Sequence, residues 1–242
     1  MEAARNIEPI TEAIFMMRLD RFLSEAGVGS RKELRAFIKS GRVSVDGVPA
    51  TGPEQKISAG QAVSVDGTVI SQTGPVVLML HKPAGYVTST SDPRDPTVME
   101  LLPPEYRRLF PVGRLDKDTE GLLLFTADGP LAHRLTSPKS RIEKEYFAET
   151  DGEIDEADIA AFAEGMVLRD GTACRPAELR KTEGGCCVVL REGKYHQVRR
   201  MLAARGKPVL YLRRIREGGL TLDGLEKGAW RLLTQTELDS LL

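Results

Sequence analysis

Three acidic side chains recur at alternate positions in the segment GRLDKDTEGLLLFT, residues 113–126. They are Asp116, Asp118 and Glu120. Spaced acids followed by Gly121 fit the start of a calcium-binding loop, but that loop needs a glutamate at its twelfth position, where Ala127 stands, and a helix after it. The apolar run LLLFT predicts a strand instead. The sequence therefore disfavours a metal site and leaves two readings, a catalytic carboxylate or an ordinary charged turn.

Length and composition limit the class of protein. A chain of 242 residues with 41% hydrophobic composition can form one large domain and one small one. No stretch approaches the roughly 18 consecutive apolar residues of a membrane span, and the chain does not open on a secretion signal. We therefore expect a soluble protein of the cytoplasm. Cys174, Cys186 and Cys187 form no CxxC pair, so we expect reduced thiols and neither disulfides nor zinc.

Charge is distributed unevenly along the chain, although its net value is only −1. Residues 191–216 hold nine Lys and Arg against one Glu, whereas residues 143–164 hold nine Asp and Glu against one Lys. Segregation on this scale predicts a basic face that binds phosphates and an acidic face that keeps the protein soluble. The alternative is two solvated faces that bind no partner.

Apolar periodicity predicts a small domain over residues 17–70, in which two short helices precede strands. We expect the helices near residues 19–26 and 30–40, each ended by a glycine. The string VSVDG stands at residues 43–47 and returns at residues 63–67. Each copy predicts a strand that enters an Asp-Gly turn.

The rest of the chain divides into a tail of residues 1–16, a linker of residues 71–75 and a second domain of residues 76–242. Strands and helices alternate irregularly in this second domain. Expected strands are residues 76–80, 122–126, 144–149, 187–191 and 209–213, and expected helices are residues 129–136, 155–165 and 197–205. This order favours an α+β fold with a mixed sheet over a doubly wound one.

The segment RLDRFLSEAGVGSRKELRAFIKSGRVSVDG, residues 18–47, closely resembles the S4 RNA-binding domain. The likeness includes both helices, the Ser-Arg start of the second helix and the Gly-x-Val-x-Val-Asp-Gly hairpin. It implies that basic side chains of this unit contact RNA. They are Arg18, Arg31, Lys32, Arg35, Lys39 and Arg42.

The segment GRLDKDTEGLLL is similar to the catalytic segment of the pseudouridine synthases, whose first aspartate corresponds to Asp116. Three further segments agree in order along the chain. HKPAGYVTS at residues 81–89 resembles the strand and loop that open the family's catalytic domain, and EKEY at 143–146 resembles the segment with the active-site tyrosine. EGKYHQVRRM at 192–201 resembles the segment whose basic residue pairs with the aspartate. The implied catalytic residues are Asp116, Tyr146 and Arg199.

The resemblance implies an isomerisation of uridine in RNA that needs neither a cofactor nor a metal. The carboxylate attacks C1′ of the ribose or acts as a base at C2′, and the sequence leaves both routes open. The uridine must leave its base stack to reach the site, while basic residues hold the RNA backbone. Residues of the catalytic domain expected to contact RNA are Lys82, Arg114, Lys194, His196, Gln197 and Arg200.

An S4 domain joined to these segments resembles the subfamily that modifies single uridines of ribosomal RNA. YHQV at residues 195–198 and the loop at 82–98 most resemble its small-subunit members. This implies 16S rRNA, within a small-subunit assembly intermediate, as the partner of a monomeric enzyme, with 23S rRNA as the alternative. Two rival hypotheses are a non-catalytic ribosome-assembly factor and a metal-dependent hydrolase that uses the three acids of residues 113–126.

Overall fold

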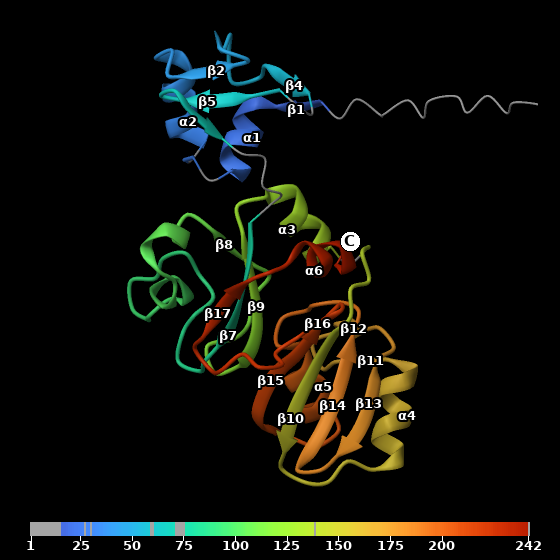
Figure 1. Ribbon diagram of the computed structural model, residues 1–242. Helices are drawn as coiled ribbons and strands as arrows, with labels where there is room; N and C mark the ends of the chain where they lie inside the picture. Colours follow the sequence, from blue (N-terminus) through green and yellow to red (C-terminus); the bar gives the residue numbers. More distant parts are fainter. Residues whose placement is uncertain are drawn as a thin grey trace, which may run out of the picture. The chain divides into compact units, whose positions relative to one another are not determined.

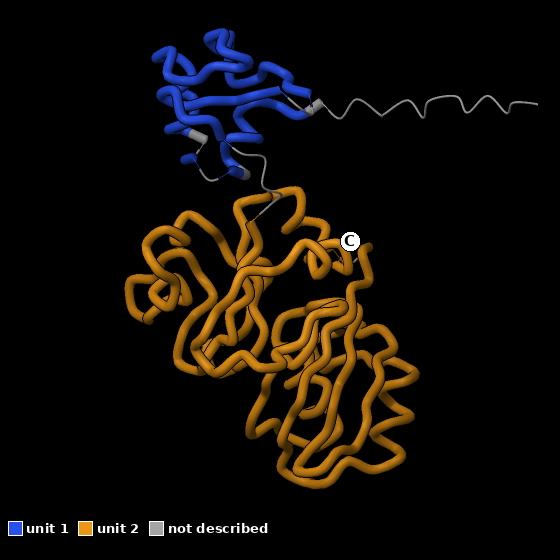
Figure 2. The backbone as a smooth tube through the Cα atoms, viewed as in Figure 1, with its two compact units in different colours: residues 1–74 blue, residues 75–242 orange. Residues whose placement is uncertain are grey.

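The computed structural model of the chain describes residues 16–26, 28–29, 31–58, 61–70, 76–137 and 139–241. The predicted linker, residues 1–15 of the predicted tail and the side chain of Arg31 lie outside this description. The chain forms two compact units, residues 1–74 and 75–242 (Figure 2). No helix of the described ranges is both long and apolar enough to cross a bilayer.

Helices α1 (Leu19–Glu25) and α2 (Arg31–Lys39) form in the N-terminal unit as the sequence predicts. α2 buries Leu34 and Ile38 in the core of the unit. Its exposed side carries Lys32, Arg35 and Lys39. The amphipathic pattern of this helix therefore leaves its cations available to solvent.

Strand β1 (Met16–Arg18) pairs with β4 (Lys56–Ser58). Met16 therefore belongs to the folded unit, and its assignment to the tail was wrong. One strand pair fixes this position, which the weak apolar pattern of so short a segment could not indicate.

The two VSVDG strings pair with each other. Their strands β2 (Val43–Val45) and β5 (Val63–Val65) lie antiparallel at the centre of a sheet, flanked by β3 (Val48–Pro49) and β6 (Thr68–Ile70). The Asp and Gly of both turns have positive φ angles, between 49° and 79°. Positive φ at both central residues is what a two-residue hairpin requires, and the Asp-Gly pairs supply it.

The larger unit is built on one mixed sheet in the order β13-β14-β10-β15-β9-β7-β17 (Figure 1). Its strands are β7 (Val77–Lys82), β8 (Phe110–Val112), β9 (Glu120–Thr126), β10 (Lys144–Thr150), β13 (Glu178–Thr182), β14 (Gly185–Leu190), β15 (Val209–Glu217), β16 (Leu220–Thr221) and β17 (Trp230–Leu232). β9 and β15 run parallel, whereas the neighbouring pairs on both sides are antiparallel. The predicted α+β fold with a mixed sheet is confirmed.

Helices cover both halves of this sheet. They are α3 (Gly129–Thr136), α4 (Glu156–Glu164), α5 (Gln197–Ala204) and α6 (Gln235–Ser240). The unit also contains short 3₁₀ turns at Val98–Leu101 and Pro104–Tyr106 and the strand pair β11 (Met166–Val167) and β12 (Ala173–Cys174). α3 and α6 pack on one face of β7 and β9, and residues 98–115 cover the other face. α4 and α5 pack against the half that contains β10 and β14. Burial on both faces explains the unbroken apolar runs of β7 and β9.

The basic and acidic segments do not form opposite faces, so that prediction was wrong in its simple form. β10 carries part of the acidic segment and lies between β14 and β15. Arg216 pairs with Glu143 and Glu145, and Arg191 also pairs with Glu143. Strand pairing therefore neutralises cations and anions that stand 48 to 73 residues apart in sequence.

Gly121 sits at the parallel junction of the two halves of the sheet. It pairs with Arg214, has a φ of 114°, and a Cβ placed on it would lie 2.2 Å from the carbonyl oxygen of Arg214. A side chain at this position would force the strands apart. The hydroxyl of Tyr211 donates to Glu120 at 2.7 Å and Arg214 Nε donates to the carbonyl of Leu122 at 2.7 Å, so contacts on both sides reinforce the junction.

We predict that Gly121→Ala lowers the free energy of unfolding by about 3 kcal/mol or more, because it adds backbone strain and a clash with β15. Gly184→Ala is the matched control. Gly184 also has a positive φ, 75°, but a Cβ there meets no atom within 4 Å. It should cost about 1–2 kcal/mol. Urea unfolding measures both variants, and equal losses would contradict the role of the close approach.

Candidate active site

A cleft of about 640 Å³ opens beside this junction. One wall comes from the loop between β8 and β9, which carries Asp116. The other walls come from β10, β14, β15 and the segment before α5. They contribute, among others, Tyr146, Leu190, His196 and Arg214. The cleft therefore gathers residues from both halves of the sheet around one carboxylate.

The loop that carries Asp116 is held by the segment that follows β7. Thr88 Oγ1 donates to the carbonyl of Leu115 at 2.6 Å and accepts from the amide of Leu115 at 3.1 Å. The amide of Gly85 donates to the carbonyl of Lys117 at 2.8 Å. The segment HKPAGYVTS thus contributes to the site by fixing the position of the acidic loop.

Lys82 does not contact RNA, contrary to the sequence prediction, because it is completely buried. Its Nζ donates to the carbonyls of Pro83, Asp116, Lys117 and Thr119 at 2.8–3.3 Å. Burial lowers the pKa of the ammonium to about 8, against the opposing attraction of Asp118, Glu120 and Asp116. Lys82 is therefore a positioning residue that ties the acidic loop to the end of β7.

We predict that Lys82→Met changes how stability depends on pH. Between pH 8 and 10.5 the unfolded chain binds more protons at Lys82 than the folded chain, so the stability of wild type rises with pH relative to the variant. The difference between the two unfolding free energies should grow in favour of wild type by about 2 kcal/mol from pH 7.5 to 9.5. Urea unfolding at several pH values measures it, and parallel curves would refute the assignment.

His196 is brought directly onto Asp116, with 3.2 Å between His196 Nε2 and Asp116 Oδ1. His196 precedes α5 and has left-handed backbone angles, φ 47° and ψ 37°. Such a conformation is strained in a residue other than glycine and is common at functional sites. Its ring stacks on that of Tyr195, with 3.8 Å between the centroids and 19° between the planes.

Arg199 is not the partner of Asp116, and that prediction was wrong. Its Nη2 lies 2.9 Å from Oδ2 of Asp118, and it does not line the cleft. Arg214 lines the cleft and is buried, at 2% exposed, whereas Arg114 and Arg191 line it from exposed positions. The reason is the direction of the two side chains. Helix α5 directs Arg199 toward Asp118 in the outer part of the acidic loop, whereas strand β15 directs Arg214 into the cleft.

The side chain of Arg214 lies against a buried carboxylate, that of Glu217. Glu217 Oε2 lies 3.3 Å from Arg214 Nη2, and Lys144 also lies 3.6 Å from the carboxylate of Glu217. Nη2 nevertheless has no hydrogen-bond partner among the described residues. Nη2 therefore lies beside the Glu217 carboxylate with part of its hydrogen-bonding capacity unused.

Tyr146 is partly buried between two hydrophobic clusters, at the point where both meet the cleft. Burial raises the pKa of its phenol, and the charge of Arg214 opposes this effect. The hydroxyl therefore stays protonated at neutral pH. The structure thus brings Asp116 and Tyr146 to one cleft, as predicted, and adds Arg214.

Gln197 is also a buried scaffold residue and not an RNA contact. It is 4% exposed, its Oε1 accepts from the amide of Lys194 at 2.9 Å and its Nε2 donates to Glu192 at 2.8 Å. Lys194 donates through Nζ to the carbonyl of Ala173. This network holds the segment 192–197 along the cleft.

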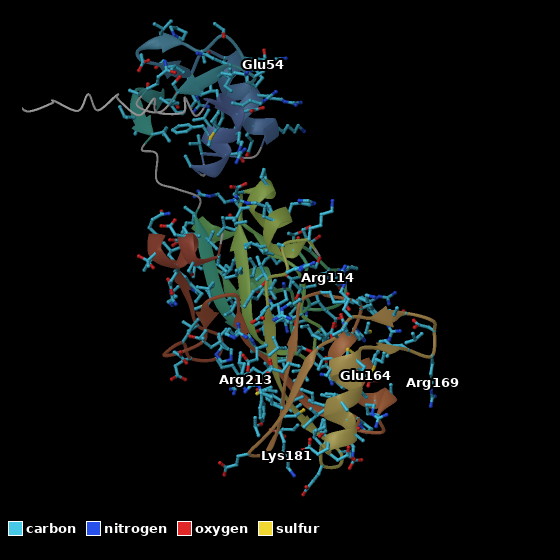
Figure 3. All side chains as sticks on the ribbon, turned by 90° about the vertical axis from the view of Figure 1, so that its right-hand side faces the viewer. Glu54, Arg114, Glu164, Arg169, Lys181 and Arg213 are labelled. Atoms are coloured by element: carbon cyan, nitrogen blue, oxygen red, sulfur yellow. The ribbon has the colours of Figure 1, made fainter. Side chains whose placement is uncertain are left out.

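Of the other predicted RNA contacts whose side chains are described, several lie at accessible positions. Arg114 is exposed at the rim of the cleft and is labelled in Figure 3. Arg200 Nη2 pairs with Asp170 at 2.5 Å, and Arg200 Nη1 donates to the carbonyl of Tyr195 at 3.2 Å. In the N-terminal unit Arg18 pairs with Asp20, while Arg42 pairs with Asp66 and lies 4.2 Å from the centre of the Phe37 ring.

Sequence reasoning missed Arg214 because it is one of several cations in the basic segment. The sequence signal that could have identified Arg214 is strand alternation. Because neighbouring side chains of β15 point to opposite faces, only alternate cations of this strand can face the cleft. Arg213, labelled in Figure 3, lies 5.9 Å from the centre of the Phe147 ring and not in the cleft. Alternation along β15 thus separates two adjacent arginines into different environments.

Comparison with known proteins identifies both units. Residues 76–204 match the RNA pseudouridylate synthase family, and residues 17–63 match the S4 domain, which confirms the resemblance of the N-terminal unit. A protein of Vibrio parahaemolyticus named ribosomal small subunit pseudouridine synthase A is 42% identical over 231 residues, covering 93% of this chain and 99% of the relative.

Two further relatives extend this similarity. The protein of the same name in Escherichia coli is 40% identical over 231 residues, covering 93% of this chain and all of the relative. A crystal structure of a pseudouridylate synthase matches with a TM-score of 0.67 and 35% identity over 93% of this chain and all of that one. The similarity therefore spans both units.

Proposed function

Because the chain belongs to the RNA pseudouridylate synthase family, we propose that it converts a uridine of 16S ribosomal RNA to pseudouridine. Full-length relatives with the name ribosomal small subunit pseudouridine synthase A support the choice of RNA. One observation carries the chemistry, namely that Asp116, Tyr146 and Arg214 line the same cleft.

The reaction breaks the bond between C1′ of the ribose and N1 of uracil, turns the base, and joins C1′ to C5. C5 loses a proton and N1 gains one, so the product is an isomer and the balance needs no oxidant, reductant or cofactor. A carboxylate attacks C1′ to form a covalent intermediate or removes the proton at C2′. Both routes need an ionised carboxylate beside the ribose, and we assign this role to Asp116.

Arg214 and Tyr146 complete the proposed site. The positive charge of Arg214 lines the same cleft as Asp116 and can stabilise negative charge there when RNA shields the site from water. The ring of Tyr146 offers a flat face to the uracil, and its protonated hydroxyl can donate a hydrogen bond to the base. If Tyr146 takes the proton from C5, its hydroxyl must first give its own proton to N1 of the released uracil, and the charge of Arg214 favours the phenolate that this leaves.

The S4 domain supplies a second contact with RNA in this proposal. Lys32, Arg35 and Lys39 are exposed on one helix and suit phosphate binding. We propose 16S rRNA within a small-subunit assembly intermediate, in the cytoplasm, as the substrate. Base contacts at the cleft and the shape of the RNA would select the uridine.

Incubation with 16S and 23S rRNA fragments and with assembly intermediates tests the activity. Pseudouridine is mapped by carbodiimide-dependent primer-extension stops, and we expect one stop in 16S rRNA. A stop in 23S rRNA alone would show that 23S rRNA, and not 16S rRNA, is the substrate. No stop in either RNA would reject the proposed function. Asp116→Asn should abolish the product while RNA affinity persists, whereas Asp118→Asn should retain product formation.

A second pair of variants compares the two arginines. Arg214→Met should lower kcat by about 100-fold or more, because it removes a buried positive charge from the cleft in which the reaction takes place. Arg199→Met removes a cation that pairs with Asp118 and should keep kcat within about threefold of wild type. Single-turnover assays with saturating enzyme measure the rates. A larger loss in Arg199→Met than in Arg214→Met would restore Arg199 as the partner.

A further inference from the structure

Tyr195 forms an exposed aromatic surface at the wall of the cleft. Its side chain lines the cleft, and the residue is 75% exposed. His196 stacks against one face of the ring. The exposure of Tyr195 therefore belongs to its other face and its edges.

The main chain that carries this ring is anchored before any ligand binds, and His196 stacks on the ring. Arg200 donates to the carbonyl of Tyr195, and the next residue in the chain, His196, contacts Asp116. The buried side chain of Gln197 holds the amide of Lys194, directly before Tyr195. A ring held in this way loses little conformational freedom when a flat ligand stacks on it.

The surroundings of the ring suit a nucleic acid strand. Lys194 and Arg114 line the same cleft, and Arg200 lies next to the main chain of Tyr195. Proteins bind single-stranded RNA by combining cations along the backbone with aromatic rings that stack on unpaired bases. Tyr195 thus has the two properties of such a ring, an open face and nearby positive charge.

We propose that Tyr195 stacks on the nucleobase next to the target uridine, with His196 as the ring behind it. A uridine that turns into the cleft leaves its neighbour without a stacking partner, which is part of the cost of extruding a base. The ring of Tyr195, at the wall of the same cleft, replaces that partner. This inference rests on the proposed function and identifies a subsite for a second nucleotide.

The first test is kinetic. Tyr195→Ala should raise KM for the 16S rRNA fragment that carries the mapped uridine by about tenfold, with little change in kcat. Tyr195→Phe keeps the ring and should restore KM. Leu210→Ala is the matched control, because Leu210 is 70% exposed but does not line the cleft. Its KM should equal that of wild type.

The second test removes the base and keeps the backbone. Fragments with an abasic nucleotide on the 5′ side or on the 3′ side of the uridine are assayed with wild type and Tyr195→Ala. On one of the two fragments the difference between the proteins should fall from about tenfold to less than twofold, because the stacking partner is gone.

The outcomes separate this inference from the proposed function. Wild type without product on the native fragment would reject the function. Active wild type with an unchanged KM in Tyr195→Ala would reject the subsite alone. A tenfold difference that persists on both abasic fragments, or a KM that Tyr195→Phe fails to restore, would also reject stacking on a neighbouring base. Urea unfolding of Tyr195→Ala should match wild type, since the side chain is exposed.

Discussion

Gly121 and Arg214 meet backbone to backbone where β9 and β15 run parallel, and this contact joins the two halves of the catalytic sheet. Asp116 precedes β9 by a short turn, whereas Tyr146 and His196 belong to the half that contains β10 and α5. The cleft exists because these halves approach closely at one glycine. The segment of residues 113–126 thus carries the carboxylate of Asp116 and also contains Gly121, the point at which the half of the sheet with the other cleft residues is attached.

A buried cation at the end of β7, Lys82, stabilises the acidic loop. Lys82 satisfies carbonyl groups that a tight loop would otherwise leave unpaired, and the loop acids partly offset the cost of burying its charge. Thr88 fixes the loop again at Leu115. The carboxylate of Asp116 consequently projects from a well-anchored turn. His196 contacts this carboxylate from the other side of the cleft and further restricts its position.

Charge pairing within the sheet neutralises part of the basic segment, residues 191–216. β10 inserts an acidic strand beside β15, so Glu143 and Glu145 neutralise cations that the sequence places in a basic segment. The cations at the cleft are therefore a local group and not a continuous basic face. A local group of this kind, with the ring of Tyr195 among it, suits recognition of a few nucleotides beside the reacting uridine.

Sequence alone predicted most of the helices and the central strands, because apolar periods indicate them, and the segment around Asp116 indicated the family. It did not predict β13, β17 or α6. Burial on both faces made β7 and β9 readable as unbroken apolar runs. The partners were decided by tertiary structure. Lys82, Arg199, Gln197 and Arg214 are all polar residues whose role depends on which way each side chain points and what it meets there. The pairing of β9 with β15 brings Arg214 beside Gly121, about 90 residues away in sequence, whereas β7 and α5 orient the other three side chains.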